Sequence, residues 1–193
     1  MSVAAVVLAA GASRRLGELK QLIHLNGETL LERAVRVATE AGCKPVIVVL
    51  GASAEIVRQR TALKDVVIVM NEAWTGGMGS SVCAGVHVLD RAVDGCVIMT
   101  CDMPAVTAEH LRALMSGDEV MASSYGGRHG VPAYFPREMF ASLMQLQGDA
   151  GARSLLKEAR TIELSGGELD IDTAEDLDRA RKLFHDGKKA VLD

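Results

Sequence analysis

Two basic residues, Arg15 and Lys20, stand in a loop of small residues that directly follows an apolar run near the start of the chain. Gly11, Ala12 and Ser13 would let the backbone approach a ligand closely, and successive N–H groups in such a loop form a concavity that binds anions. An arginine fork and a lysine point charge both match phosphate oxygens. The loop therefore predicts a phosphate site, although a flexible loop with solvated basic side chains has the same spacing. The spacing is neither that of a Walker A motif nor that of a dinucleotide fingerprint.

Carboxylates form a second group of candidate residues. Asp102 ends another apolar run and is followed by Pro104, and a carboxylate at the carboxyl end of a strand can hold Mg²⁺ against a bound triphosphate. Asp170 and Asp172 would share one face of an extended segment, so one of them could complete the metal site. The alternatives are a turn or cap at Asp102, and a helix cap at Asp172 or Thr173, which is the favoured role of that pair.

Glycine-rich stretches form the third group. Residues 71–81 hold three glycines and two serines ahead of a helix, so their backbone amides could wrap a base or a phosphate. The single Trp74 in this stretch is expected to anchor the loop and not to stack on a base. Glycines in residues 130–132 and 148–153 suit a lid or an acceptor loop in which Arg153 meets an anionic substrate, and they equally suit simple turns.

The elements that must position these residues alternate between strands and helices. Residues 3–9, 45–50, 66–70 and 95–100 are continuous apolar runs, which predict strands buried on both faces. This order favours an α/β fold whose mostly parallel sheet carries helices on both faces and binds ligands outside the carboxyl ends of the strands. The expected helices start at Thr29, in a capping box with Glu32 and ending at Gly42; at Ser53, through residue 62; at Ser80 or Ser81, to about residue 89; and at Thr107, through residue 114.

The second half of the chain has a less regular pattern. Residues 120–124 and 131–135 could form two strands of a hairpin. Further helical patterns run from Pro136 to about residue 146, over residues 152–159, and from Thr173 to about residue 184, with a final strand near residues 168–171. We expect a single domain over residues 1–185 and a loosely held tail over residues 186–193.

Composition excludes several classes of protein. The chain has 21 basic and 25 acidic residues and only 3% aromatic residues, which argues against an extended nucleic-acid surface. Its longest apolar runs fall short of the ~20 residues that span a bilayer, and its first residues lack the basic region of a signal peptide. The four cysteines show no Cys-x-x-Cys spacing and no histidines show His-x-x-x-His spacing. We therefore expect reduced thiols, no structural zinc, and a cytoplasmic protein with no nucleic-acid or membrane partner.

Together, these stretches resemble the signature of the molybdenum-cofactor nucleotidyltransferase family, over about residues 3–184. Several motifs in the same order are far more specific than any one of them. The chain is most similar to the CTP:molybdopterin cytidylyltransferase group, because guanylyltransferase relatives carry Leu-Ala-Gly-Gly at the first four positions of the opening motif. Leu16, Met103 and Ala174 depart from the usual Met, Gln and Pro. The motifs are Leu8-Ala9-Ala10-Gly11-Ala12-Ser13-Arg14-Arg15-Leu16-Gly17-x-x-Lys20-Gln21-Leu22, Asn71-x-x-Trp74-x-x-Gly77-Met78-x-Ser80-Ser81, Cys101-Asp102-x-Pro104, Gly148-Asp149-x-Gly151-Ala152-Arg153 and Asp170-Ile171-Asp172-Thr173.

The resemblance implies a Rossmann-like, three-layer α/β/α nucleotidyltransferase fold. It also implies Mg²⁺-dependent transfer of CMP from CTP to the terminal phosphate of molybdopterin cofactor, with release of pyrophosphate and a molybdoenzyme as a possible client. Alternatives are guanylyl transfer from GTP to the same cofactor, nucleotidyl transfer to another phosphorylated small molecule, and a non-catalytic molybdenum-cofactor carrier. The implied roles are triphosphate binding by Gly11, Arg15 and Lys20; contact with base and ribose by Ala9, Ala10, Asn71, Ser80 and Ser81; Mg²⁺ binding by Asp102 and Asp172; acceptor binding by Asp149 and Arg153; and catalysis by Arg15, Lys20 and Asp102.

Overall fold

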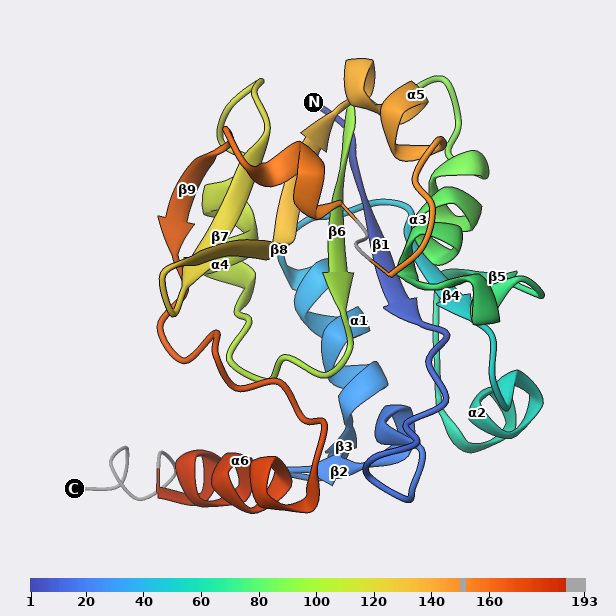
Figure 1. The fold of residues 1–193 in the computed structure, drawn as a ribbon, viewed down its shortest axis with the longest axis vertical. Helices are drawn as coiled ribbons and strands as arrows, with labels where there is room; N and C mark the ends of the chain where they lie inside the picture. Colours follow the sequence, from blue (N-terminus) through green and yellow to red (C-terminus); the bar gives the residue numbers. More distant parts are fainter. Residues whose placement is uncertain (150–151, 187–193) are drawn as a thin grey trace.

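A seven-stranded sheet forms the centre of the protein, as seen in a computed structural model that describes residues 1–149 and 152–186 (Figure 1). The strand order is β5-β4-β1-β6-β8-β7-β9, and a separate two-stranded sheet pairs β2 with β3. Strand β8 runs antiparallel to β6 and β7, whereas the other pairs of the large sheet are parallel. The strands are β1 (Val3–Ala9), β2 (His24–Leu25), β3 (Glu28–Thr29), β4 (Val46–Leu50), β5 (Val66–Met70), β6 (Gly95–Thr100), β7 (Met121–Tyr125), β8 (Arg128–Pro136) and β9 (Arg160–Glu163).

Helices connect most of these strands. The α-helices are α1 (Leu30–Glu40), α2 (Ala54–Arg60), α3 (Met78–His87), α4 (Ala108–Leu114), α5 (Phe140–Leu143) and α6 (Ala174–Asp186). Short 3-10 helices are η1 (Lys20–Leu22), η2 (Trp74–Gly76), η3 (Arg137–Met139) and η4 (Arg153–Leu156). Within the described residues, none of the helices has the length and apolar character needed to cross a membrane.

The two faces of the sheet are covered by different helices. Strand β1 is buried along its whole length, so its alternate side chains enter two separate cores. Ala5 and Val7 pack with α1 and α4 on one face, whereas Val6 and Leu8 pack with α3 and α5 on the other. The predicted three-layer α/β/α arrangement with a mostly parallel sheet is thereby confirmed (Figure 1).

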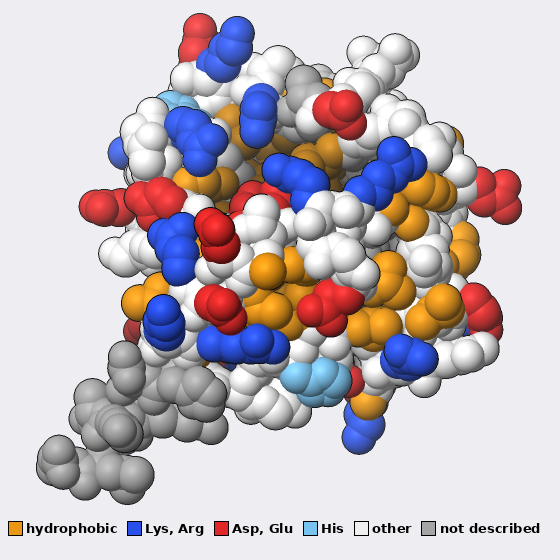
Figure 2. Space-filling view, turned by 60° about the horizontal axis from the view of Figure 1, so that its bottom comes forward, with side chains coloured by type: hydrophobic (Ala, Val, Ile, Leu, Met, Phe, Trp, Pro, Cys, Tyr) orange, Lys and Arg blue, Asp and Glu red, His pale blue; other side chains and the backbone are white. Residues whose placement is uncertain are grey.

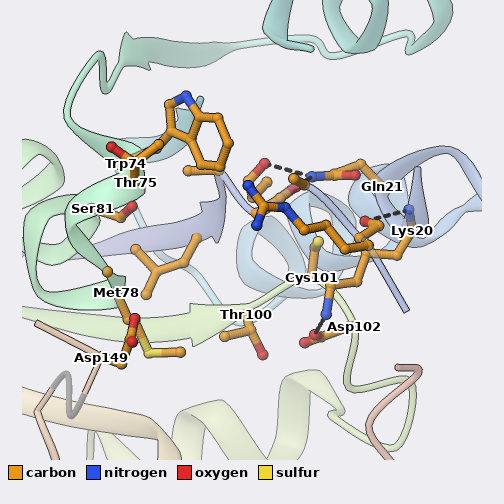
Figure 3. Close-up of a pocket in the computed structure, with 18 of the residues that line it drawn as sticks. Lys20, Gln21, Trp74, Thr75, Met78, Ser81, Thr100, Cys101, Asp102 and Asp149 are labelled. Atoms are coloured by element: carbon orange, nitrogen blue, oxygen red, sulfur yellow. Dashed lines mark hydrogen bonds and ion pairs between the residues drawn. The ribbon is translucent and has the colours of Figure 1, made fainter. Parts of the chain in front are cut away.

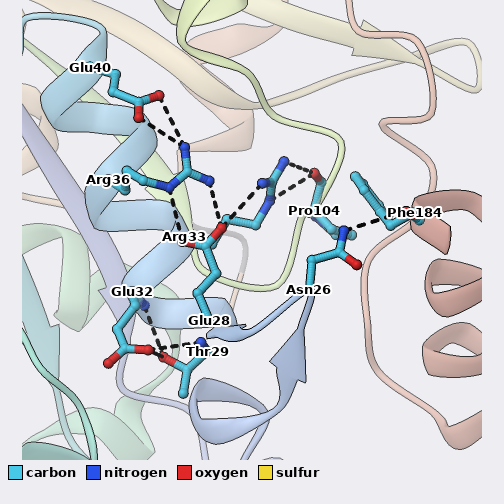
Figure 4. Close-up of polar contacts among 9 residues, drawn as sticks. All are labelled: Asn26, Glu28, Thr29, Glu32, Arg33, Arg36, Glu40, Pro104 and Phe184. Atoms are coloured by element: carbon cyan, nitrogen blue, oxygen red, sulfur yellow. Dashed lines mark hydrogen bonds and ion pairs between the residues drawn. The ribbon is translucent and has the colours of Figure 1, made fainter. Parts of the chain in front are cut away.

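Helix α1 begins at the predicted capping box and fixes the loop that follows β6. Thr29 Oγ1 accepts a hydrogen bond from the Glu32 N–H at 3.1 Å, and Glu32 Oε2 accepts one from the Thr29 N–H at 2.9 Å (Figure 4). One turn further on, Arg33 donates from Nη2 and Nε to the carbonyl oxygen of Pro104, at 2.7 and 3.2 Å. On the other side of this loop the Ile171 N–H donates to the carbonyl oxygen of Asp102 at 3.0 Å. The backbone around Asp102 is therefore held between α1 and the chain that leads to α6.

Two predicted strands differ in the structure. Residues 66–70 form β5 as predicted, but at the edge of the sheet, where Val67 is 46% and Met70 is 50% exposed, so the expected burial on both faces is wrong. A continuous apolar run gives no information on the order of strands in a sheet. The strand expected near residues 168–171 is absent, and the last strand is β9, which the sequence pattern did not predict. The helical pattern over residues 152–159 yields only the short η4.

Several helix ends also differ from expectation. Ser53 precedes α2 but adopts a left-handed conformation and makes no side-chain cap. Helix α3 begins at Met78 after Gly77, ahead of the serines expected to cap it. Residues 136–146 form the end of β8, η3 and the single turn α5 in place of one long helix.

The last helix confirms its predicted start. Thr173 Oγ1 accepts a hydrogen bond from the Asp176 N–H at 3.2 Å, so the favoured helix cap is present. Helix α6 packs against Ile23 and Leu25 next to the β2–β3 hairpin, which the sequence did not predict. The predicted boundary at residue 185 falls inside α6, which continues to Asp186; residues 187–193 of the expected tail lie outside the described residues.

Candidate functional site

A cavity of about 570 Å³ opens at the carboxyl ends of β1 and β6. In the sheet, β4 lies on one side of β1 and β6 lies on the other, so the strand order reverses direction between β1 and β6. Such a switch point is where α/β sheets bind ligands. On this face of the molecule, Lys and Arg side chains surround a hollow with hydrophobic side chains at its bottom (Figure 2). The cavity is lined by Leu8, Ala9, Ala10, Gly11, Ala12, Ser13, Arg14, Arg15, Lys20, Gln21, Trp74, Thr75, Gly77, Met78, Ser81, Thr100, Cys101, Asp102 and Asp149.

The loop after β1 presents backbone donors to this cavity. Across the described part of the chain, the N–H groups of residues 11–15 have no protein acceptor. Ser13 Oγ accepts a hydrogen bond from the Lys20 N–H at 3.0 Å, which closes the loop on itself. The buried Gln21 side chain donates from Nε2 to the carbonyl oxygens of Ala9 and Gly11, at 2.8 and 2.9 Å. A loop with free amides and occupied carbonyls is suited to an anion.

Lys20 is the centre of the charged part of the site. Its Nζ forms an ion pair with Asp102 and donates to Asp172 Oδ1 at 2.9 Å, and Arg15 also pairs with Asp172 (Figure 3). Burial alone lowers the pKa of Lys20, but the charge of Asp102 and the hydrogen bonds that Lys20 donates to Asp102 and Asp172 outweigh burial and raise the pKa above its ordinary value. The structure thus joins four of the predicted site residues in one ionised cluster.

Two further groups lie beside this cluster. Burial, together with the charges of Asp102 and Asp172, raises the pKa of Asp170 above its usual value. Burial, aided by the charge of Asp102, raises the pKa of the Cys101 thiol to about 12. At neutral pH this thiol is protonated, and because the thiolate is the nucleophilic form, Cys101 is unsuited to covalent catalysis.

The same carboxylates are suited to a divalent metal ion. Asp102 and Asp172 direct oxygens at one point, which the Lys20 ammonium now fills. Magnesium is commonly bound by one or two carboxylates together with substrate phosphates and water. In residues 1–149 and 152–186 no group of three or more His, Cys, Asp or Glu side chains could hold a metal ion. A metal at this point would therefore need oxygen ligands from a bound phosphate as well.

The polar residues of the 71–81 loop mostly bond to one another. Asn71 Nδ2 donates to Ser80 Oγ at 2.9 Å and to Ser81 Oγ at 3.0 Å, and Ser80 Oγ donates to the carbonyl oxygen of Gly77 at 2.8 Å. Ser81 lines the main cavity, whereas Asn71 and Ser80 line a separate hollow of about 550 Å³ beside α3. The structure therefore does not bring Asn71 and Ser80 to the main cavity as the resemblance implied.

Trp74 forms one wall of the cavity. A Cβ built on Gly51 would lie 2.6 Å from Trp74 Cβ and 2.9 Å from Ala10 Cβ, so the tryptophan packs directly against bare backbone. Figure 3 shows its ring on the side of the cavity opposite Asp102. Trp74 thus anchors its loop and also offers an aromatic surface to a ligand.

The two residues assigned to the acceptor are placed differently. Asp149 lines the cavity, and its Oδ1 would lie only 2.6 Å from a Cβ built on Gly77, so residues 148–149 pack closely on the 71–81 loop. Arg153 is exposed at the start of η4 and does not line the cavity. Residues 150–151, which connect the two, lie outside the described residues.

Sequence reasoning assigned no role to Gln21 or Arg14, two polar residues among those that line the cavity. Gln21 is 1% exposed and Arg14 is exposed at the cavity wall. Gln21 belongs to the opening motif, but the resemblance implies no role for it. Its signal in the sequence is an amide among the apolar residues 19, 22 and 23, next to Lys20. Because a buried polar side chain is normally hydrogen-bonded, an amide at that place predicts a specific partner.

Three relatives and one solved protein illustrate what the chain resembles. Nicotine blue oxidoreductase of Paenarthrobacter nicotinovorans is 33% identical over 94% of this chain and 95% of its own length. The probable molybdenum cofactor guanylyltransferase of Opitutus terrae is 32% identical over 73% and 70%, and the molybdenum cofactor cytidylyltransferase of Escherichia coli is 25% identical over 93% and 95%. The crystal structure of Rv0371c from Mycobacterium tuberculosis is 30% identical, covers 94% of this chain and 98% of that one, and has a TM-score of 0.83; the same protein also has a structure in complex with manganese.

The family description that matches is "MobA-like NTP transferase domain", over residues 5–163. This range holds the strands that form the cavity, the loop after β1 and the Asp102 loop. A further solved relative, a nucleotidyl transferase from Methanothermobacter, is 26% identical with a TM-score of 0.83. The chain therefore belongs to the MobA-like NTP transferase family, and it is a nucleotidyltransferase with a Rossmann-like fold.

Proposed function

We propose that this protein transfers CMP from CTP to the terminal phosphate of molybdopterin cofactor, with release of pyrophosphate and with Mg²⁺ as the metal. The observation that carries the proposal is the position of the loop after β1, whose free N–H groups face the same cavity as Lys20 and Asp102. A triphosphate needs cations and amide donors, and its metal needs carboxylates. One cavity supplies all three.

In the proposed reaction an oxygen of the acceptor phosphate attacks the α-phosphorus of CTP. A new P–O bond forms, the bond between the α-phosphorus and the bridging oxygen breaks, and pyrophosphate leaves with the electron pair. The acceptor oxygen is already anionic, so no general base is needed. Catalysis then consists of positioning and of neutralising charge.

The loop amides and the charged side chains of the site each have one task in this scheme. The amides of residues 11–15 and the side chains of Arg15 and Lys20 hold the β- and γ-phosphates and neutralise the leaving group. Lys20 would exchange its carboxylate partners for phosphate oxygens, because Mg²⁺ would take the point between Asp102 and Asp172 that the ammonium fills. Asp102 and Asp172 would hold Mg²⁺, which would supply a positive charge next to the α-phosphate.

The choice of CTP over GTP rests on the resemblance of the opening motif. Ala10 lines the cavity, and the guanylyltransferase relatives carry glycine at that position, in Leu-Ala-Gly-Gly. This difference in the motif supports CTP as the donor.

The deciding experiment measures pyrophosphate release from each of the four nucleoside triphosphates, with and without molybdopterin cofactor. We expect release from CTP that requires both the cofactor and Mg²⁺. A preference for GTP would overturn the argument from Ala10, and release that ignores molybdopterin but needs a sugar phosphate or polyol phosphate would assign another acceptor.

Two rival functions are separated by the same assay. A non-catalytic carrier would bind the finished dinucleotide cofactor and release no pyrophosphate, but it has little use for a cluster of Arg15, Lys20 and Asp102. The name of the nicotine blue relative suggests oxidoreduction. Against this, the loop after β1 lacks the Gly-x-Gly-x-x-Gly spacing of a dinucleotide site. Oxidation of NADH or NADPH without pyrophosphate release would favour that rival.

A further inference from the structure

The buried amide of Gln21 lies at the base of the loop after β1. Its side chain is 1% exposed, and one nitrogen, Nε2, donates to two carbonyl oxygens two residues apart, Ala9 at 2.8 Å and Gly11 at 2.9 Å. The carbonyl oxygen between them, on Ala10, accepts from the Ala52 N–H at 3.0 Å. Three successive carbonyls are therefore held by protein donors.

This arrangement determines which sign of charge the loop attracts. A free carbonyl at the carboxyl end of a parallel strand would repel a phosphate, whereas a free N–H attracts it. The carbonyls of residues 9–11 are engaged, and the N–H groups of residues 11–15 have no acceptor among the described residues. Because Lys20 immediately precedes Gln21, the same anchor also fixes the backbone that carries the ammonium.

The oxygen of the Gln21 amide, in contrast to its nitrogen, has no partner: Oε1 is buried and accepts no hydrogen bond within the described structure. An unsatisfied buried acceptor is unfavourable for folding, and glutamine is a poor choice for stability alone at this position. The orientation of the amide is understandable if the two donor hydrogens are needed for the loop.

We propose that Gln21 is the positioning residue of the nucleotide loop: by engaging the carbonyls of Ala9 and Gly11 it keeps the loop amides turned toward the triphosphate. This inference rests on the proposed function for the identity of the ligand, but the anion selectivity of the loop holds for any polyphosphate. Gln21 is a positioning residue and not a catalytic one, since the donors of its amide are engaged with backbone carbonyls.

The test compares Gln21→Met with wild type. Methionine matches the length of the side chain, removes both donors and also removes the orphaned oxygen. We expect the affinity for CTP and for inorganic pyrophosphate, measured by calorimetry, to fall by about 10- to 100-fold, the scale of a small misplacement of binding groups. Resistance to urea should fall modestly, because the carbonyls of Ala9 and Gly11 lose their donor while the orphaned oxygen is removed. A residue that only supports the fold predicts the same loss of stability with unchanged affinity in the folded protein.

Two further variants keep the test decisive. Gln21→Asn retains the amide but cannot span both carbonyls, so it should lose affinity even if the methionine variant fails to fold. Gln59→Met is the matched control, because Gln59 is an exposed amide on α2 that donates to Glu55, and it should behave like wild type.

The outcomes separate this inference from the proposed function. If Gln21→Met and Gln21→Asn bind pyrophosphate and CTP within about twofold of wild type, less than 0.5 kcal/mol, Gln21 does not position the loop. If wild type binds pyrophosphate but none of the four nucleoside triphosphates, the proposed function fails while the loop remains testable with pyrophosphate alone.

Discussion

Two glycine-rich loops border the same cavity and use their polar groups in opposite ways. The loop after β1 leaves the N–H groups of residues 11–15 unpaired in the described structure, and it directs Arg15 toward Asp172 and Lys20 toward Asp102. In the 71–81 loop the polar side chains of Asn71 and Ser80 form hydrogen bonds within the loop itself. Both looked alike as candidate phosphate loops in the sequence, since each combines small and hydroxyl residues after a strand.

The difference shows that a binding loop is recognised by the groups it leaves unsatisfied. Glycine content alone describes the flexibility of the chain, whereas free donors describe what it can bind. In the first loop an element outside the loop, Gln21, takes up the carbonyls. In the second, Asn71 takes up the hydroxyls, and the loop serves as a wall that carries Trp74. The comparison therefore supports the proposal that the first loop binds the ligand and the second shapes the cavity.

The largest effect is expected at Asp102, the carboxylate that both the ammonium and the proposed metal use. Asp102→Asn keeps the volume but removes the negative charge, and we expect the rate of pyrophosphate release to fall by about 10³-fold or more. Thermal unfolding followed by circular dichroism should show that the variant is folded. A near-wild-type, Mg²⁺-dependent rate would remove Asp102 from the site.

A smaller loss is expected for Lys20→Met. The variant should lose roughly 2–4 kcal/mol of transition-state stabilisation, the scale of one preorganised electrostatic contact. It should also bind Mn²⁺ more tightly than wild type in the absence of nucleotide, because Asp102 and Asp172 no longer share an ammonium. Electron paramagnetic resonance of bound Mn²⁺ measures this directly. An unchanged rate together with unchanged Mn²⁺ affinity would show that Lys20 neither stabilises the transition state nor competes with the metal.

The sequence predicted those parts of the fold and of the site that depend on neighbouring residues. The capping box at Thr29, the cap at Thr107 and the ends of β1 and β6 all depend on patterns within a few residues. The convergence of Arg15, Lys20, Asp102 and Asp172 was also predicted, because the carboxyl ends of parallel strands meet at one edge and the resemblance paired the two aspartates.

What escaped prediction depends on contacts far apart in the chain. The edge position of β5 follows from the order of strands, which local apolarity does not contain. The self-satisfied Asn71 requires a helix that starts at Met78, two residues before the expected serine cap. Gln21 needs two carbonyls located ten or more residues upstream. In each case the residue type was visible in the sequence and the partner was not.

Two glycines test the comparison between the loops directly. A Cβ at Gly11 would meet nothing within 4 Å, whereas a Cβ at Gly77 would lie 2.5 Å from the carbonyl carbon of Gly148, at a residue with a φ of +95°. We therefore expect Gly11→Ala to leave urea stability unchanged and to weaken CTP binding, because the methyl group would occupy open space at a residue that lines the cavity. Gly77→Ala should lose about 1–3 kcal/mol of folding free energy through backbone strain. Equal stability losses in both variants would contradict the division of roles.

The smallest and most discriminating effect is expected at Asn71. Asn71→Ala removes the donors that hold Ser80 and Ser81, and two neutral hydrogen bonds of this kind contribute about 1–2 kcal/mol to the free energy of unfolding. Because Asn71 lines the separate hollow and not the main cavity, the dissociation constant for CTP should change by less than about threefold, or ~0.7 kcal/mol. Urea denaturation and calorimetry measure the two quantities on the same preparation. If affinity falls strongly while stability stays at the wild-type value, Asn71 contacts the nucleotide after all, and the 71–81 loop must close further over the bound ligand than its present hydrogen bonds allow.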